Sequence, residues 1–264
     1  MTSKSEGRKV KSIEQAGDIL EYLRMEGPAT IADLESVVPL SAGSIHTYLA
    51  TLKDYGFIEQ EGTKYRIGSM FIPYGVRVRN STELYSASKD IIEAVAHEVG
   101  GCVHLQKEYN NRLLILEEVY GENTAGLDLH IKKRGNLQNH IHCTAGGKSI
   151  LAQLPEPKVH QILDDHGLPT QTSQTITDRE QLLDELKLVR KQGYAVNDQE
   201  HMHGIRAVGA PICRDNNGEV LGAISISGSA ATWTGQIFNE KIPNKVKEIS
   251  NEIEINIHSK DRNE

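Results

Sequence analysis

The 264-residue chain is poor in cysteine and aromatic residues and contains no long apolar run. Its cysteines, Cys102, Cys143 and Cys213, form no C-x-x-C pair, so we expect buried thiols and no disulfide framework. No stretch approaches the length that crosses a bilayer, and residues 1–12 lack the apolar segment of a secretory signal. These absences favour a water-soluble globular protein of the cytoplasm that has no membrane partner.

Positive charge is outnumbered, because 29 lysines and arginines stand against 36 acids and leave a net charge of −7. Nonspecific affinity for nucleic acid comes from neutralised phosphates, so this balance argues against a protein that coats nucleic acid indiscriminately. Residues up to about 80 hold roughly equal numbers of acids and bases, and the acidic excess lies in the remainder. The asymmetry fits a DNA-facing module attached to an acidic sensor.

The amino-terminal segment predicts short helices followed by a hairpin. Apolar residues recur at helical spacing over 13–23, and Thr30 and Ser41 can cap two further helices. Residues 57–60 and 64–68 alternate like the strands of a hairpin. This order is typical of a winged helix-turn-helix, whose third helix enters the major groove.

Polar side chains on the third helix and the wing are the candidates for contact with DNA. Hydroxyl, imidazole and amine groups reach base edges or phosphates, and the wing cations neutralise backbone charge. The predicted DNA-binding residues are Ser41, Gly43, Ser44, His46, Thr47, Lys53, Lys64 and Arg66. The pattern alone leaves open a helical bundle for protein contacts, and thus a sensor or adaptor with a degenerate DNA-binding domain.

Beyond residue 70, the pattern predicts a mixed α+β domain. Residues 70–80 resemble a connection, because Pro73 and Gly75 interrupt regularity, and a helix follows over 82–99. That helix either packs on the next domain or transmits motion and dimerises. Further helices are predicted over 147–154, 157–165, 179–192 and 243–258, and strands over 102–105, 113–119, 194–196, 207–213 and 220–227, with a turn at 215–218. The second strand is apolar enough for the interior of a sheet.

Other motifs in the sequence have features of different chemistry. Gly147-Lys148-Ser149 looks like the end of a phosphate-binding loop, but the required earlier glycine would fall at His142, so that motif fails. His142 and Cys143 would point in opposite directions in a strand, so no nucleophile lies beside a base, and neither an enzyme nor a cofactor is expected. Two histidine pairs leave a metal-dependent regulator open, with His140, His142, His201 and His203 as candidate ligands.

Three sequence segments resemble the IclR family of bacterial and archaeal regulators. Residues 142–152, HCTAGGKSILA, are similar to the family's H-x-T-A-x-G-K-A-x-L-A. GYAVNDQE at 193–200 precedes GIRAVGAPI at 204–212, and GAISISG follows at 222–228. Order and spacing agree throughout, and the likeness covers nearly the whole chain.

This resemblance implies a winged helix-turn-helix over 1–75, a linker and linker helix over 76–100, and a GAF-like effector domain over 101–264. It also implies homodimers, or tetramers built as dimers of dimers, on a palindromic operator. The effector would be a small organic acid, sugar acid or aromatic metabolite. The implied effector-binding residues are Ala145, Gly146, Asn197, Ile205, Ala207, Ser225 and Ser227.

These implied positions make physical sense, because alternate serines on a strand face the same side and a glycine turn that opens a helix presents free N–H groups. The sequence departs from the family in places: Asn197 stands where an acid is common, and Ala207 where a cysteine often stands. Ala42 and Thr47 replace frequent cations, which reduces phosphate contacts. The effector, the operator, and the choice between repressor and activator stay open.

Overall fold

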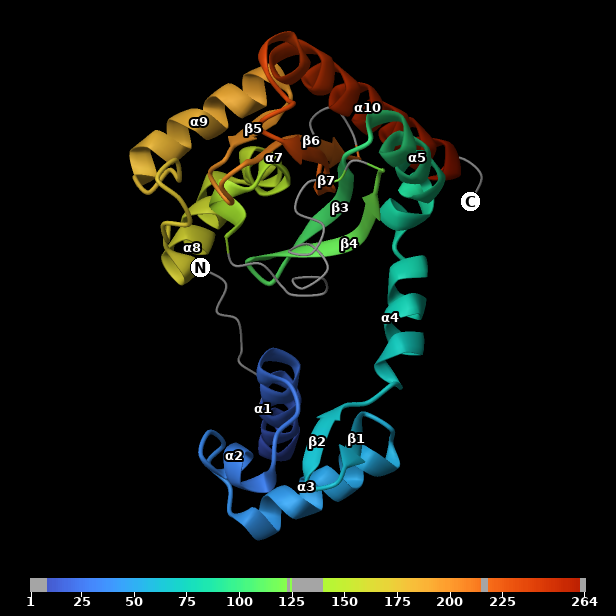
Figure 1. Ribbon diagram of the computed structural model, residues 1–264, viewed down its shortest axis with the longest axis vertical. Coiled ribbons are helices and arrows are strands. Elements are labelled where there is room, and N and C mark those ends of the chain that lie inside the picture. The colour runs from blue at the N-terminus through green and yellow to red at the C-terminus, as the bar shows by residue number, and fades with distance from the viewer. Residues whose placement is uncertain (1–8, 123, 125–139, 215–217, 262–264) are drawn as a thin grey trace. The chain divides into compact units, whose positions relative to one another are not determined.

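The computed structural model describes residues 9–122, 124, 140–214 and 218–261. The chain forms two compact units, which divide between Arg79 and Asn80 (Figure 1). The class is α+β, as predicted, with a mainly helical first unit and a second unit built on a sheet. Most of the turn predicted at 215–218 lies outside the described residues.

The first unit has the helices and the hairpin that the sequence predicts. Helices α1 (Lys11–Glu26), α2 (Ile31–Glu35) and α3 (Ala42–Asp54) precede strands β1 (Ile58–Glu61) and β2 (Lys64–Ile67), which pair antiparallel. A bridge between Ala29 and Tyr65 ties the hairpin to the segment before α2. The core of this unit is a single cluster that includes Ile19, Leu34, Ile45, Leu49 and Ile58.

Side-chain caps set the starts of α2 and α3. The Thr30 hydroxyl accepts a hydrogen bond from the Asp33 backbone N–H, and the Asp33 carboxylate accepts one from the Thr30 N–H. Ser41 accepts in the same way from the Ser44 N–H. These bonds satisfy donors that the first helical turn leaves without an intrahelical partner, so both predicted caps are confirmed.

The segment predicted as a connection after residue 70 is helix α4 (Phe71–Asn80). The proline is tolerated because Pro73 lies in the first turn, where a missing N–H removes no intrahelical bond. No α4 side chain is buried in the structure, and its exposed apolar residues include Phe71, Ile72 and Val76. The interpretation of Pro73 and Gly75 as helix breakers was therefore wrong.

The second unit contains one antiparallel sheet in the order β4-β3-β7-β6-β5. The strands are β3 (Cys102–Tyr109), β4 (Arg112–Tyr120), β5 (Ala195–Asp198), β6 (Ile205–Cys213) and β7 (Val220–Ser229). Strand β4 lies at an edge, with many half-buried residues, so its apolar sequence did not indicate an interior strand. The strands β3 and β7, which are distant in sequence, lie side by side at the centre.

Helices cover both faces of this sheet (Figure 1). Helices α5 (Glu83–Val99) and α10 (Ile242–Asp261) pack on one face. A short turn of π-helix, Ile237–Lys241, directly precedes α10. Helices α7 (Ala145–Gln153), α8 (Glu156–His166) and α9 (Arg179–Gln192) form the other layer. Leu84, Ile92 and Val95 of α5 belong to the sheet core, so the predicted linker helix packs on the second unit. Among the helices of the described part of the chain, none has the length and apolar character that crossing a membrane requires.

Candidate functional site

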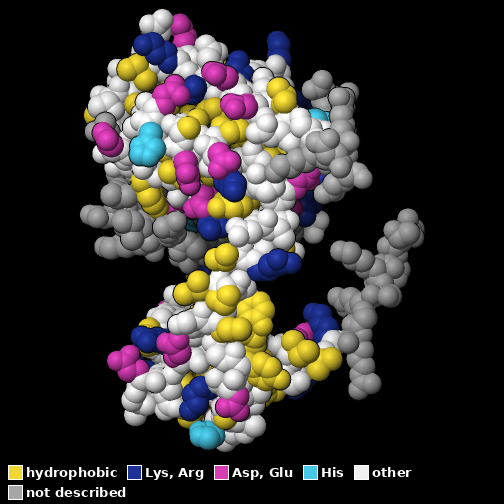
Figure 2. Space-filling model, turned by 90° about the vertical axis from the view of Figure 1, so that its right-hand side faces the viewer, with side chains coloured by type: hydrophobic (Ala, Val, Ile, Leu, Met, Phe, Trp, Pro, Cys, Tyr) yellow, Lys and Arg dark blue, Asp and Glu magenta, His cyan; other side chains and the backbone are white. Residues whose placement is uncertain are grey.

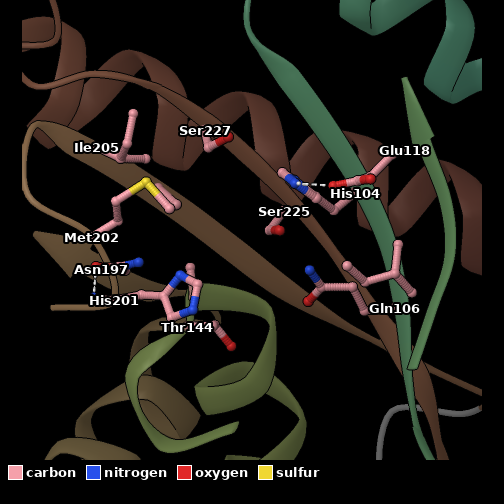
Figure 3. Close-up of a pocket in the computed structure, with 13 residues that line it drawn as sticks. His104, Gln106, Glu118, Thr144, Asn197, His201, Met202, Ile205, Ser225 and Ser227 are labelled. Carbon is pink, nitrogen blue, oxygen red and sulfur yellow. Dashed lines mark hydrogen bonds and ion pairs between the residues drawn. The ribbon is translucent and has the colours of Figure 1, made fainter. Parts of the chain in front are cut away.

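A partly enclosed cavity of about 70 Å³ lies in the second unit, between the sheet and the amino end of α7 (Figure 3). By the same measure a water molecule needs roughly 10–15 Å³, so the cavity suits a small organic molecule. Its lining comes from the sheet, the start of α7 and the loop after β5. The lining residues are His104, Gln106, Ile115, Glu118, Thr144, Ala145, Asn197, His201, Met202, Ile205, Ala207, Ser225 and Ser227.

Strand β7 brings both predicted serines to this cavity. Because side chains alternate along a strand, Ser225 and Ser227 face the cavity while Ile224 and Ile226 enter the core against α5 and α10. Both serines are buried, and the close-up in Figure 3 shows them on the same side of the sheet. The structure therefore brings together the predicted residues Ala145, Asn197, Ile205, Ala207, Ser225 and Ser227 around one cavity.

Strand β3 contributes residues that sequence analysis missed. Its alternate positions Val103 and Leu105 fill the core, which leaves Cys102, His104 and Gln106 on the side of the cavity. Over residues 102–106, polar or sulfur-bearing residues alternate with apolar ones, and this alternation is the signal that the sequence offered. The other missed lining residues, Ile115, Glu118, Thr144 and Met202, come from separate elements, and no local pattern connects them.

A buried polar cluster occupies the end of the cavity at β3 and β4. His104 Nε2 lies 3.1 Å from a carboxylate oxygen of Glu118 and 3.4 Å from the sulfur of Cys102. Tyr120 donates a hydrogen bond of 3.0 Å to the other oxygen of Glu118. Burial alone would lower the pKa of His104, but Cys102 and Glu118 outweigh it and raise that pKa above the ordinary histidine value.

Gln106 lines the cavity and has an unsatisfied side-chain acceptor. Its side chain is 5% exposed, and within the described residues no donor reaches its carbonyl oxygen, Oε1. A buried polar atom without a partner costs about 1–3 kcal/mol, so such an atom beside a cavity indicates a donor from a ligand or a water. The same oxygen lies 1.8 Å from where a Cβ on Gly146 would stand.

Glycines allow α7 to approach the sheet closely at the cavity. A Cβ on Gly209 of β6 would lie 2.7 Å from the carbonyl carbon of Ala145 and 2.8 Å from the nitrogen of Gly146. Gly146 thus supports the cavity without lining it. Thr144 caps the helix by accepting from the Gly147 N–H at 3.1 Å. The positive end of α7 therefore faces the cavity, where it favours an anion.

The loop after β5 is shaped by Asn197. Its side-chain oxygen accepts hydrogen bonds from the backbone N–H groups of Glu200 at 2.8 Å and His201 at 3.4 Å. A carboxylate at this position could not form the same bonds and also donate to a ligand, whereas the amide of Asn197 keeps its nitrogen as a donor. The departure from the family's common acid therefore changes what the cavity offers.

The lysine of the glycine turn serves the fold. Lys148 is 1% exposed, and its ammonium lies 2.6 Å from Glu200 and 3.2 Å from Glu185 of α9. Burial raises the pKa of Glu200, although Lys148 opposes that shift. These ion pairs link α7 to α9 and to the loop that lines the cavity.

The predicted metal-ligand histidines come partly together. The ring centre of His140 lies 6.5 Å from that of His142 and 6.3 Å from that of His201, whereas His203 is exposed. His142 and Cys143 belong to a short 3₁₀ turn, Ile141–Cys143, and not to a strand, so the argument from strand alternation does not apply to them. Whether these histidines hold a metal stays a prediction.

On the first unit, helix α3 exposes Gly43, His46, Thr47 and Lys53. Ser41 and Ser44 are engaged in the cap, where their hydroxyl oxygens lie 3.1 Å apart. Lys53 donates to the side chain of Gln60 at 3.2 Å. The Thr47 hydroxyl donates to the Gly43 carbonyl oxygen at 3.1 Å. Of the predicted set, His46 and Thr47 are the exposed side chains in the middle of the helix.

The wing, which is the hairpin of β1 and β2, carries two acids and two cations and so has no net charge. The Arg66 guanidinium lies 3.1 Å from Glu59 and 3.5 Å from Glu61, and the exposed Lys64 stands directly opposite Glu61 in the hairpin. These acids reduce the positive potential that a phosphate would meet, although exposed pairs of this kind are weak and exchange readily.

Comparison with known proteins places this architecture in a class of transcription regulators. The family described as "Bacterial transcriptional regulator IclR C-terminal" matches residues 76–255. The probable HTH-type transcriptional regulator ArcR of Halobacterium salinarum is 34% identical over 96% of both chains. The transcriptional repressor IclR of Escherichia coli is 28% identical, over 85% of this chain and 82% of its own length.

Solved structures agree. The Thermotoga maritima IclR structure has a TM-score of 0.70 at 28% identity and covers 94% of this chain and 98% of its own. An IclR homologue from Microbacterium hydrocarbonoxydans, solved with 4-hydroxybenzoate, has a TM-score of 0.78 at 18% identity and covers 94% of this chain and 99% of its own. The chain belongs to the IclR family of transcriptional regulators, and the relatives named here are regulators, not enzymes.

Proposed function

We propose that the first unit binds double-stranded operator DNA and that a small effector in the cavity of the second unit controls this binding. The observation that carries the proposal is the cavity itself, which gathers six of the predicted effector residues in a chain that also exposes a helix of the helix-turn-helix type. An effector changes operator binding only if it favours one arrangement of the protein over another.

The lining favours a small carboxylate with an apolar or aromatic body. The hydroxyls of Ser225 and Ser227 and the amino end of α7 provide donors, while Ile115 and Ile205 provide apolar surface. The 4-hydroxybenzoate complex of the Microbacterium homologue supports this class of ligand. The apolar walls supply affinity and the donors fix orientation.

The proposed functional form is a homodimer or a dimer of dimers. Support comes from α4, an exposed helix on which Phe71, Ile72, Tyr74, Val76 and Val78 leave apolar surface uncovered. Figure 2 shows hydrophobic side chains gathered over this helix and the adjoining part of the first unit. Contiguous apolar surface of this kind marks protein contacts, and a palindromic operator requires two copies.

The effector test combines a thermal-shift screen of small acids with operator DNA selected from a random duplex library. We expect a binding acid to raise the melting temperature of the wild-type chain and to change its operator affinity. In the double variant Ser225→Ala/Ser227→Ala, loss of two hydrogen bonds should weaken the effector by about 10–30-fold. Operator affinity without effector should stay unchanged.

Isothermal titration of the same acid into wild-type and double-variant protein measures the loss directly. A double variant that keeps both full effector affinity and full response would refute the pocket. Ser229→Ala, at an intermediate-exposure position on the same strand beyond the cavity lining, is the matched control.

The oligomer test introduces charge into the apolar face of α4. In Ile72→Glu/Val76→Glu, carboxylates would be buried in the dimer contact, so we expect a monomer by light scattering and operator binding weakened by more than about tenfold. Because neither residue is buried within its own chain, the monomer should melt as the wild type does. An unchanged oligomer would exclude α4 from the interface.

A sensor or adaptor with a degenerate DNA-binding domain is the second candidate function. The acids that accompany Arg66 and Lys64 favour it, because they reduce phosphate contacts. Failure to enrich any duplex, together with retained effector binding, would support the adaptor. A selected duplex whose affinity falls steeply with salt would support the regulator.

A further inference from the structure

We propose that Cys102, His104 and Glu118 bind one transition-metal ion of the zinc type and that an effector oxygen completes its coordination from the cavity. The metal site follows from these residues alone, whereas the role of the effector rests on the proposed function. In the described part of the chain, the ligand atoms of these three residues lie close enough together to hold a metal ion. The sulfur, a ring nitrogen and a carboxylate oxygen are all within 4.8 Å of one another.

The spacing of these atoms suits tetrahedral coordination. Zinc binds thiolate sulfur at about 2.3 Å and imidazole nitrogen at about 2.0–2.1 Å, which places neighbouring ligand atoms roughly 3.3–3.6 Å apart at tetrahedral angles. Here the sulfur of Cys102 lies 3.4 Å from His104 Nε2, and that nitrogen lies 3.1 Å from Glu118 Oε1. An ion needs only small side-chain adjustments to enter.

The sheet holds the three side chains in place. Cys102 and His104 are two residues apart on β3, so they share a face, and Glu118 stands opposite His104 on β4. Tyr120 donates to the second oxygen of Glu118 and leaves Oε1 directed toward His104. Such outer contacts orient ligands and typically change metal affinity by about 10–100-fold.

The free coordination position would face the cavity. His104 and Glu118 line it, and the register places Ser225 opposite His104 and Ser227 opposite Cys102 (Figure 3). Zinc with three protein ligands commonly keeps a fourth position for water or another molecule. A carboxylate could thus reach the ion and the serine hydroxyls together.

This site differs from the histidine cluster predicted from sequence. The histidine rings are centred 6.3 and 6.5 Å apart around His140, and they do not appear among the described groups with converging ligand atoms. A thiolate, an imidazole and a carboxylate also form a mixed donor set suited to zinc and cobalt. Cys102 is therefore the residue that distinguishes the two sites.

The test titrates Zn²⁺ and Co²⁺ into untagged full-length protein in competition with a chromogenic chelator. We expect one ion per chain and, with Co²⁺, a thiolate-to-metal charge-transfer band. Cys102→Ser and Glu118→Gln should each weaken binding by about 100-fold or more, and Cys102→Ser should abolish the band. Using two variants protects the test against misfolding of either, which the melting temperature reveals.

Cys143→Ser and His140→Gln are the matched controls, a buried thiol outside the group and the centre of the histidine cluster. Both should bind metal as the wild type does. No stoichiometric ion in the wild type, or loss of the ion in His140→Gln with retention in Cys102→Ser, would overturn the site.

Acetohydroxamate, a small chelating oxygen ligand, tests the open position. We expect it to shift the visible spectrum of the cobalt protein, and an unchanged spectrum would overturn coordination from the cavity. These measurements use no DNA. A chain that binds cobalt but no duplex would contradict the proposed regulator and leave the metal site standing.

Discussion

The two units hold their candidate sites in opposite ways. In the first unit the residues lie on one exposed helix and a neighbouring hairpin, separated by few positions in the chain. In the second unit the cavity residues extend from His104 to Ser227 and are mostly buried within the sheet and its helices. An exposed site can change without loss of stability, whereas a buried site shares its side chains with the core.

The largest expected effect lies on the exposed site. In His46→Ala/Thr47→Ala we expect operator affinity to fall by about 100-fold, because each base contact contributes roughly 1–3 kcal/mol. The free energy of unfolding should stay within about 0.5 kcal/mol of wild type, since both side chains are exposed. Fluorescence anisotropy with the selected duplex and urea unfolding measure the two quantities. Unaltered sequence-specific binding would mean that the recognition surface lies elsewhere.

Acid should affect the second unit next most strongly. Burial, followed by the charges of His140 and Lys148, lowers the pKa of His142 to about 4 from an ordinary 6.5. In the unfolded chain His142 gains its proton as the pH falls through 6.5, whereas in the folded protein it stays neutral. Its contribution is therefore complete above pH 6.5 and is lost as the pH falls toward 4, by up to roughly 3 kcal/mol.

Trp233, the only tryptophan of the chain, lies in the core of the second unit and reports on its unfolding. Urea unfolding followed by its fluorescence at pH 7 and pH 5 should show a smaller loss of stability in His142→Gln than in wild type. Other titrating groups cancel in this comparison. An equal loss in both proteins would contradict the buried neutral imidazole.

A glycine pair provides the smallest and most discriminating effect. A Cβ on Gly17 of α1 or on Gly43 of α3 would meet nothing within 4 Å, so alanine should fit at both positions. We expect Gly17→Ala to stabilise the chain by about 0.5–1 kcal/mol and Gly43→Ala by no more than this. Gly43→Ala should also weaken the operator if the backbone of α3 approaches DNA, whereas Gly17→Ala should not. Equal operator affinities would remove Gly43 from the interface.

Local chemistry explains which elements were predictable. The caps at Thr30 and Ser41 and the limits of α9 depend on nearby residues, and the structure confirms them. Helix α4 was missed because Pro73 was taken as a breaker, although its place in the first turn makes it harmless. The edge position of β4 was missed because an apolar strand does not reveal its neighbours.

The same distinction between local and long-range chemistry applies to the residues of the candidate site. Ser225 and Ser227 were predictable because a period of two puts them on one face. The cluster of Cys102, His104 and Glu118 was not, because it depends on how β3 pairs with β4. Likewise, the side-chain oxygen of Gln106 can pack against α7 only because residue 146 is a glycine, since a Cβ there would lie 1.8 Å from that oxygen.

By itself, the sequence determined the order of the helices and strands apart from α4, the caps of α2 and α3, and the family, because each depends on short-range chemistry or on motifs along the chain. Tertiary structure decided which side chains share the cavity, which acids balance the wing, and where a metal can bind. Those outcomes depend on strand register and close packing between residues that are distant in sequence, which local preferences do not encode.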